Sequence, residues 1–108
     1  MIQIGRVIWE DADGSLLILL VNDLSIKARD TVRITHWPEQ KKATLVKIRG
    51  KKEITRARKN ADGSITIDRD VSRAAKGGIK VRLAKNLGLT PGMAQLVQEE
   101  SGKATISQ

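Results

Sequence analysis

Short apolar runs that alternate with polar residues recur along the chain, and turn residues separate many of them. "TVRIT" (31–35) and "IKVRL" (79–83) alternate strictly, with apolar residues at every second position and basic residues between them. A period of two predicts a strand with one buried face. Further strands are expected in four other apolar stretches: "IQIGRVIW" (2–9), "LLILLV" (16–21), "ATLVKI" (43–48) and "MAQLV" (93–97). The pattern therefore predicts a mainly β fold.

The sequence Ala-Asp-Gly-Ser occurs twice, each time directly before an apolar run. Residues 12–35 align without a gap with residues 61–84, giving eight identical pairs at an offset of 49. Each unit reads as strand, Asp-Gly turn, strand, connection, strand, because Asp-Gly between apolar runs favours a hairpin. We therefore expect one domain (1–108) that closes into a small pseudo-two-fold barrel. Its predicted parts are tandem units at about 1–49 and 50–98 and a C-terminal extension at 99–108.

One or two short helices are expected within this barrel. "DRDVSRAAKG" (68–77) can form two helical turns, with Asp68 or Asp70 as a cap and Gly77-Gly78 as the stop. An alternative architecture has an N-terminal β domain followed by a helix-turn-helix in "VRLAKNLGLTPGMAQLV" (81–97).

A family resemblance points to the same barrel architecture. "GGIKVRLAKNLGLTPG" (77–92) resembles the signature of cradle-loop barrels, the group that includes double-psi barrels and the AbrB-type swapped-hairpin transcription regulators. "IKARDTVRI" (26–34) resembles a variant of the same strand entry. In those families, Gly and Pro-Gly form the turn that leads into a strand. The resemblance implies a barrel and, through the AbrB-type members, a role in transcription.

Positive charge is the most pronounced compositional feature. The chain has 20 Lys and Arg against 12 Asp and Glu, a formal net charge of +8. Such a balance attracts polyanions. The excess is concentrated between residues 41 and 59, where the candidate nucleic-acid-binding residues are Lys41, Lys42, Lys47, Arg49, Lys51, Lys52, Arg56, Arg58 and Lys59.

The basic segment is expected to form a β-hairpin around Gly50-Lys51, with Arg56 and Arg58 on one face of the return strand. A two-stranded basic ribbon fits the major groove of DNA, and each neutralised phosphate releases counterions. The sequence thus predicts a small cytoplasmic transcriptional regulator that forms a homodimer and binds duplex DNA. The alternative is a protein-interaction, adaptor or virion barrel module whose basic face meets an acidic protein.

Other chemistry has few candidate residues. Trp9 is expected in the core and Trp37 in a loop as a packing anchor, which favours duplex over single-strand binding. The single histidine, His36, is expected in a turn, and the chain has no cysteine. Because phosphate-loop, nucleophile-elbow and metal-ligand motifs are absent, we expect no enzyme activity, no cofactor and no metal. The apolar runs are too short to cross a membrane, so no membrane association is expected.

Overall fold

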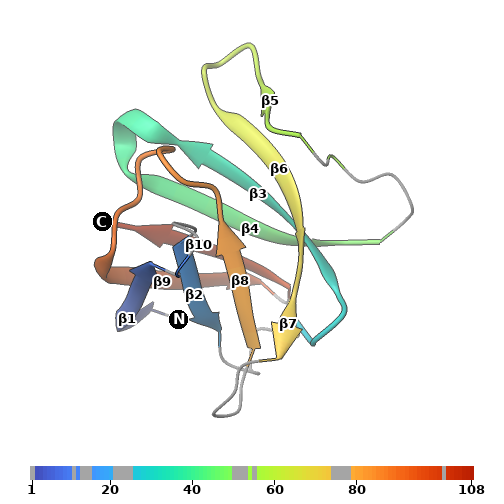
Figure 1. Cartoon of the computed structure of the whole chain (residues 1–108), viewed down its shortest axis with the longest axis vertical. Helices are drawn as coiled ribbons and strands as arrows, with labels where there is room; N and C mark the ends of the chain where they lie inside the picture. The colour runs from blue at the N-terminus through green and yellow to red at the C-terminus, as the bar shows by residue number, and fades with distance from the viewer. Residues whose placement is uncertain are drawn as a thin grey trace.

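The protein forms a mainly β structure in which the strands make one curled antiparallel sheet (Figure 1). The computed structural model describes residues 2–10, 12, 16–20, 26–49, 54, 56–73, 79–100 and 102–108. Within these ranges a 3-10 turn occupies Pro38–Gln40. The strands are β1 (Ile2–Glu10), β2 (Leu16–Leu20), β3 (Thr31–Trp37), β4 (Lys42–Ile48), β5 (Arg58–Lys59), β6 (Ile65–Asp70), β7 (Ser72–Arg73), β8 (Ile79–Leu83), β9 (Gly92–Glu100) and β10 (Lys103–Ser107).

The sheet curls almost back onto itself. Its strand order is β5-β6-β3-β4-β10-β9-β1-β2-β8-β7. Only Val71 separates β6 from β7, so one bent segment pairs with β3 at its start and with β8 at its end. Figure 1 shows this segment running along the side of the molecule to reach β8. The result is the barrel-like shape that the sequence predicts.

The alternating residues of the strands form the core inside the curl. In β3 the burial pattern alternates along the whole strand, and β8 repeats it. Ile34 lies opposite Leu45 of β4 and Ile67 of β6, and all three side chains are buried. Burying a side chain of this size stabilises a fold by roughly 1.5–3 kcal/mol. The strict alternation of "TVRIT" and "IKVRL" therefore positions one apolar face inward, as expected.

The helix expected over 68–77 is wrong for its first six residues. Asp68 and Asp70 lie in β6, and Ser72–Arg73 form β7. The capping signal of an Asp is local, whereas pairing of β6 with β3 over Thr31–His36 supplies backbone hydrogen bonds that a helix would lose. Residues 74–78, where the helix was expected to end, lie outside the described residues.

The alternative helix-turn-helix over 81–97 is also wrong. β8 pairs with β2 and β9 pairs with both β1 and β10, so both predicted helices are strands. Gly92, which the alternative required inside a recognition helix, has φ +137 and begins β9. Within the described ranges, no helix is long and apolar enough to cross a bilayer.

Candidate functional site

The basic segment does not form the predicted hairpin. β4 has a partner on each edge, β3 on one side and β10 on the other. β5 instead pairs with β6, so two strands separate it from β4. A hairpin between β4 and β5 would need an edge that β10 already occupies. The expectation of a two-stranded basic ribbon between residues 43 and 59 is therefore wrong for the described residues.

The cations of this segment are divided between the two ends of β4. Lys41 and Lys42 lie at the turn that joins β3 to β4, whereas Lys47 and Arg49 lie at the opposite end. Lys47 Nζ is 3.3 Å from the carboxylate of Asp30. Lys51 and Lys52 lie outside the described residues.

The remaining candidates are exposed. Arg49, Arg56, Arg58 and Lys59 all present their side chains to solvent. Within the part of the chain that the structure describes, no carboxylate forms an ion pair with any of these four residues.

One buried carboxylate anchors the segment that carries the arginines. Asp68 accepts hydrogen bonds from Arg33 Nε at 2.9 Å and Arg33 Nη2 at 3.1 Å, and from the backbone N–H of Ile54 at 2.7 Å. The N–H of Asp68 donates to the carbonyl of Ile54 at 2.9 Å. Burial alone would raise the pKa of Asp68, but the hydrogen bonds from Arg33 and Ile54 hold that pKa below its ordinary value. Asp68 therefore fixes Ile54, in the middle of the basic segment, against β6.

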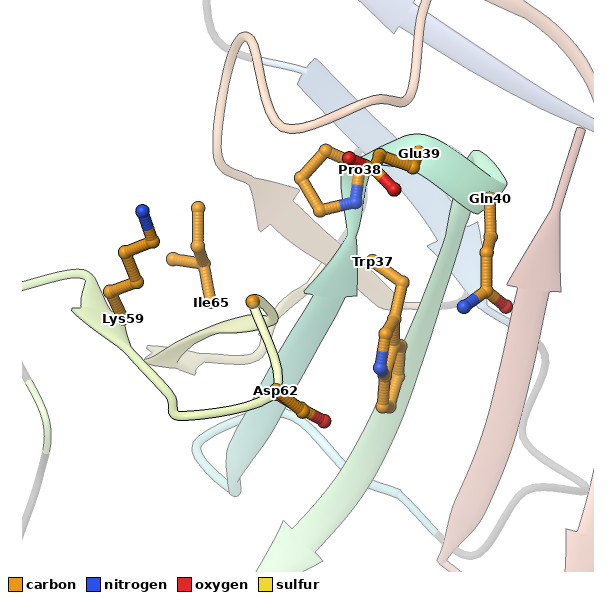
Figure 2. A pocket seen from close by; sticks show the side chains of 8 residues that line it. Trp37, Pro38, Glu39, Gln40, Lys59, Asp62 and Ile65 are labelled. Carbon is orange, nitrogen blue, oxygen red and sulfur yellow. The ribbon is translucent and has the colours of Figure 1, made fainter.

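A pocket of about 310 Å³ lies between two turns at one end of the sheet (Figure 2). The first turn joins β3 to β4 and the second joins β5 to β6. Its lining residues are Trp37, Pro38, Glu39, Gln40, Lys59, Asp62, Gly63 and Ile65. We call this hollow the Trp37 pocket.

Hydrogen bonds within the β5–β6 turn shape one wall of the Trp37 pocket. The side chain of Asn60 donates to Ser64 Oγ at 2.9 Å and to Thr66 Oγ1 at 2.8 Å. Asp62 accepts from the backbone N–H of Ser64 at 2.9 Å, which is an Asx-type turn. Gly63 adopts φ +87, and its N–H donates to the carbonyl of Asn60 at 3.0 Å. The Asp-Gly turn expected at residues 61–64 is confirmed.

Trp37 and Asp62 lie next to each other in the wall of this pocket, and the carboxylate of Asp62 points toward the indole (Figure 2). Hydrogen bonds from the hydroxyl and the backbone N–H of Ser64, together with one from the Trp37 side chain, lower the pKa of Asp62. Asp62 is therefore a carboxylate at neutral pH. Lys42 Nζ lies 4.8 Å from the centroid of the Trp37 ring, a cation–π distance.

The pocket brings together residues that the sequence analysis had kept apart. Lys59 was selected as a phosphate-binding cation, whereas Trp37 was expected only to pack and Asp62 only to turn the chain. Trp37 is half-buried at the end of β3, not in a loop. The sequence shows that Trp37 and Asp62 each lie beside a turn. Only the packing of these two turns brings the side chains together.

Two further expectations about aromatic side chains are wrong. Trp9 is 37% exposed, because the side chain of its neighbour Ile8 points into the core and Trp9 takes the opposite face of β1. His36 is a fully buried strand residue, opposite Ala43 and Ile65, since the alternation of "TVRIT" continues beyond residue 35. Neither ring nitrogen of His36 has a hydrogen-bond partner. Burial, with a smaller effect of Arg69, lowers the pKa of His36 to about 4.

The described side chains form no cluster of three or more His, Asp or Glu that could hold a metal ion. Comparison of the chain with known protein families, with curated proteins and with solved structures finds no match. A proposal of function therefore rests on the geometry of the site and on the charges around it.

Proposed function

We propose that this protein binds duplex DNA through the exposed cations between residues 41 and 59. One observation carries the proposal: Arg49, Arg56, Arg58 and Lys59 are exposed, and no described carboxylate pairs with them. The buried carboxylate of Asp68 accepts its hydrogen bonds from Arg33 and Ile54. Among the described residues, the carboxylates thus form no ion pair with these four cations, although Asp68 attracts Arg58 from beyond ion-pair distance.

The mode of contact differs from a ribbon inserted into a groove. Because β4 and β5 do not pair, the described cations lie at the end of β4 (Arg49), just before β5 (Arg56) and on the short edge strand β5 (Arg58 and Lys59). Such a surface suits phosphate contacts, which supply affinity without reading sequence. Arginine binds phosphate oxygens with two parallel hydrogen bonds, so Arg49, Arg56 and Arg58 are the principal candidates. Regulation of transcription by a dimer stays a prediction from the sequence.

A salt titration with a labelled 20-base-pair duplex tests this function. We expect the logarithm of affinity to fall linearly with the logarithm of salt concentration. Combined replacement of Arg49, Arg56 and Arg58 by Ala is expected to reduce the slope by roughly 3, about one for each lost phosphate contact. The matched control replaces Arg73, Lys80 and Lys85 by Ala and removes the same charge elsewhere.

Two results would contradict the proposal. The first is no binding of duplex at low salt, which together with stable co-purification of an acidic protein would favour the interaction module instead. The second is an equal loss of affinity in the two triple variants, because net charge rather than this surface would then explain binding.

We also infer that the two halves of the chain repeat one unit. In the hairpin of β1 and β2, Trp9 lies opposite Leu17 and Glu10 opposite Leu16. In the hairpin of β5 and β6 the partners are Arg58 with Thr66 and Lys59 with Ile65, which is the same register moved by 49 residues in both strands. The first hairpin pairs with β8 and the second with β3, so each would pair with a strand of the other unit. An experimental structure with unequal registers in the two hairpins would contradict the repeat; the resemblance to cradle-loop barrels stays a prediction.

A further inference from the structure

We propose that the Trp37 pocket receives an unpaired base of the bound DNA. This inference rests on the proposed DNA binding and adds a ligand class to it: DNA in which a duplex adjoins a single-stranded segment. The pocket lies beside β5, whose residues Arg58 and Lys59 belong to the proposed phosphate-binding surface. A strand that contacts these cations through its backbone therefore passes the mouth of the pocket.

The size and walls of the pocket suit a flat ring. Its volume of about 310 Å³ is at the lower end of the range for small-molecule sites, roughly 300–1,000 Å³. Trp37, Pro38 and Ile65 supply apolar surface from three directions, as Figure 2 shows. Gly63 adds no side chain to the lining, and a Cβ built there would meet no atom within 4 Å. This leaves open space beside Gly63 in the wall of the pocket.

The indole of Trp37 is positioned to stack on a base. Its side chain is half-buried, so the ring is held by the protein but remains in part accessible. Lys42 lies over the ring without being among the residues that line the pocket, so its ammonium covers ring surface outside the hollow. Bases stack on such rings whatever their sequence, because every base has a π-face.

The polar groups around the ring match the rest of a nucleotide. Asp62 is ionised and already accepts hydrogen bonds from Ser64 and the Trp37 side chain, and the remaining lone pairs of its carboxylate can accept one more from an N–H group on a base edge. Lys59 lines the same pocket and supplies a cation for the adjoining phosphate. A cationic peptide side chain would also suit Trp37 and Asp62, but Lys42 and Lys59 repel it. The combination of carboxylate, indole and two ammonium groups favours a nucleotide.

The experiment compares the affinity of a blunt 20-base-pair duplex with that of the same duplex carrying a six-nucleotide thymidine overhang. We expect the overhang to strengthen binding by at least about fivefold, in the range of one stacked base. Trp37→Leu is expected to abolish the difference in affinity between the two duplexes, whereas Trp37→Phe, which keeps an aromatic ring, retains most of it. Trp9→Leu is the matched control and should keep the full advantage.

Fluorescence gives an independent readout. In a Trp9→Phe background Trp37 is the sole tryptophan, and stacking of a base is expected to quench its emission saturably with the overhang duplex but not with the blunt one. Equal affinity for the two duplexes, or an overhang advantage that Trp37→Leu retains, would overturn the proposal that the pocket binds a base. The proposed binding of duplex DNA would still stand. Absence of binding to either duplex would overturn the proposed function and the pocket together.

Discussion

Arg33 and Asp68, 35 residues apart in the sequence, form a two-pronged ion pair between β3 and β6, with Nε–Oδ1 and Nη2–Oδ2 distances of 2.9 and 3.1 Å. The Asp68 side chain is completely buried, whereas that of Arg33 is 38% exposed. The pair lies in direct register across the two strands. Because Asp68 also binds the N–H of Ile54 at 2.7 Å, this ion pair connects the sheet to the basic segment.

Asp68→Asn is expected to destabilise the protein by about 2–3 kcal/mol, because the buried site loses its charge and leaves Arg33 uncompensated. Urea unfolding at pH 7 measures the effect. Asp70→Asn is the matched control on the same strand: Asp70 is exposed and, among the described residues, accepts one side-chain hydrogen bond, from Thr31 at 3.0 Å, so the expected loss is below about 1 kcal/mol. Equal losses in the two variants would show that the buried pair contributes no more than the exposed bond.

Acid is expected to destabilise the protein through His36 before most carboxylates are protonated. The imidazole has an ordinary pKa of 6.5 in the unfolded chain and about 4 in the fold, so the unfolded state binds the proton first as the pH falls. The contribution of His36 to the free energy of unfolding is complete above pH 6.5, and it decreases by roughly 3 kcal/mol as the pH falls to 4. Urea midpoints measured across this window test the expectation. His36→Leu should make the midpoints nearly constant there, and an unchanged slope in that variant would assign the effect to other groups.

Two glycines with positive φ are expected to respond differently to alanine. At Gly63 a Cβ meets nothing within 4 Å, so only the strain of the left-handed backbone is added, about 1 kcal/mol. At Gly88, with φ +102, the Cβ would lie 2.7 Å from Cα and O of Pro38, and the turn must move. Gly88→Ala is therefore expected to cost about 2–4 kcal/mol. Thermal unfolding of the two variants gives the comparison, and equal shifts would argue against the close approach of Gly88 to Pro38.

Within the basic segment, Lys47 and Arg58 are expected to contribute unequally to DNA binding. Lys47 is 3.3 Å from Asp30, whereas Arg58 is exposed on β5. Arg58→Ala should reduce the slope of log affinity against log salt concentration by roughly 1, whereas Lys47→Ala should change this slope little. Salt titrations of the two single variants measure this difference. A larger effect from Lys47 would mean that its ion pair opens when DNA binds.

Local patterns in the sequence predicted the strands, whereas long-range pairing was beyond them. The alternation in 31–35 and 79–83 reports which face of a strand is buried, and that information lies within five residues. The second neighbour of β4 does not follow from such a local pattern. β10 pairs with this edge of β4, although the basic segment follows β4 directly in the sequence. A hairpin inferred from chain proximity therefore failed.

The candidate site shows the same division between local and distant information. The Asp-Gly turn at Asp62 and Gly63 was predicted from two residues, and the structure confirms it. Its approach to Trp37, at the end of β3, depends on how two separate turns pack. Likewise, Asp68 gives the sequence signal of a helix cap, and only its distant partner Arg33 reveals a buried ion pair.

The position of β10 also bears on how the chain folds as it is synthesised. β10 lies between β4 and β9, and it is the last of these strands to leave the ribosome. Until Lys103–Ser107 emerge from the exit tunnel, the sheet lacks the strand that pairs with both β4 and β9. The nascent chain therefore exposes two unpaired edges, on β4 and β9, and completes its fold only after these residues have been translated.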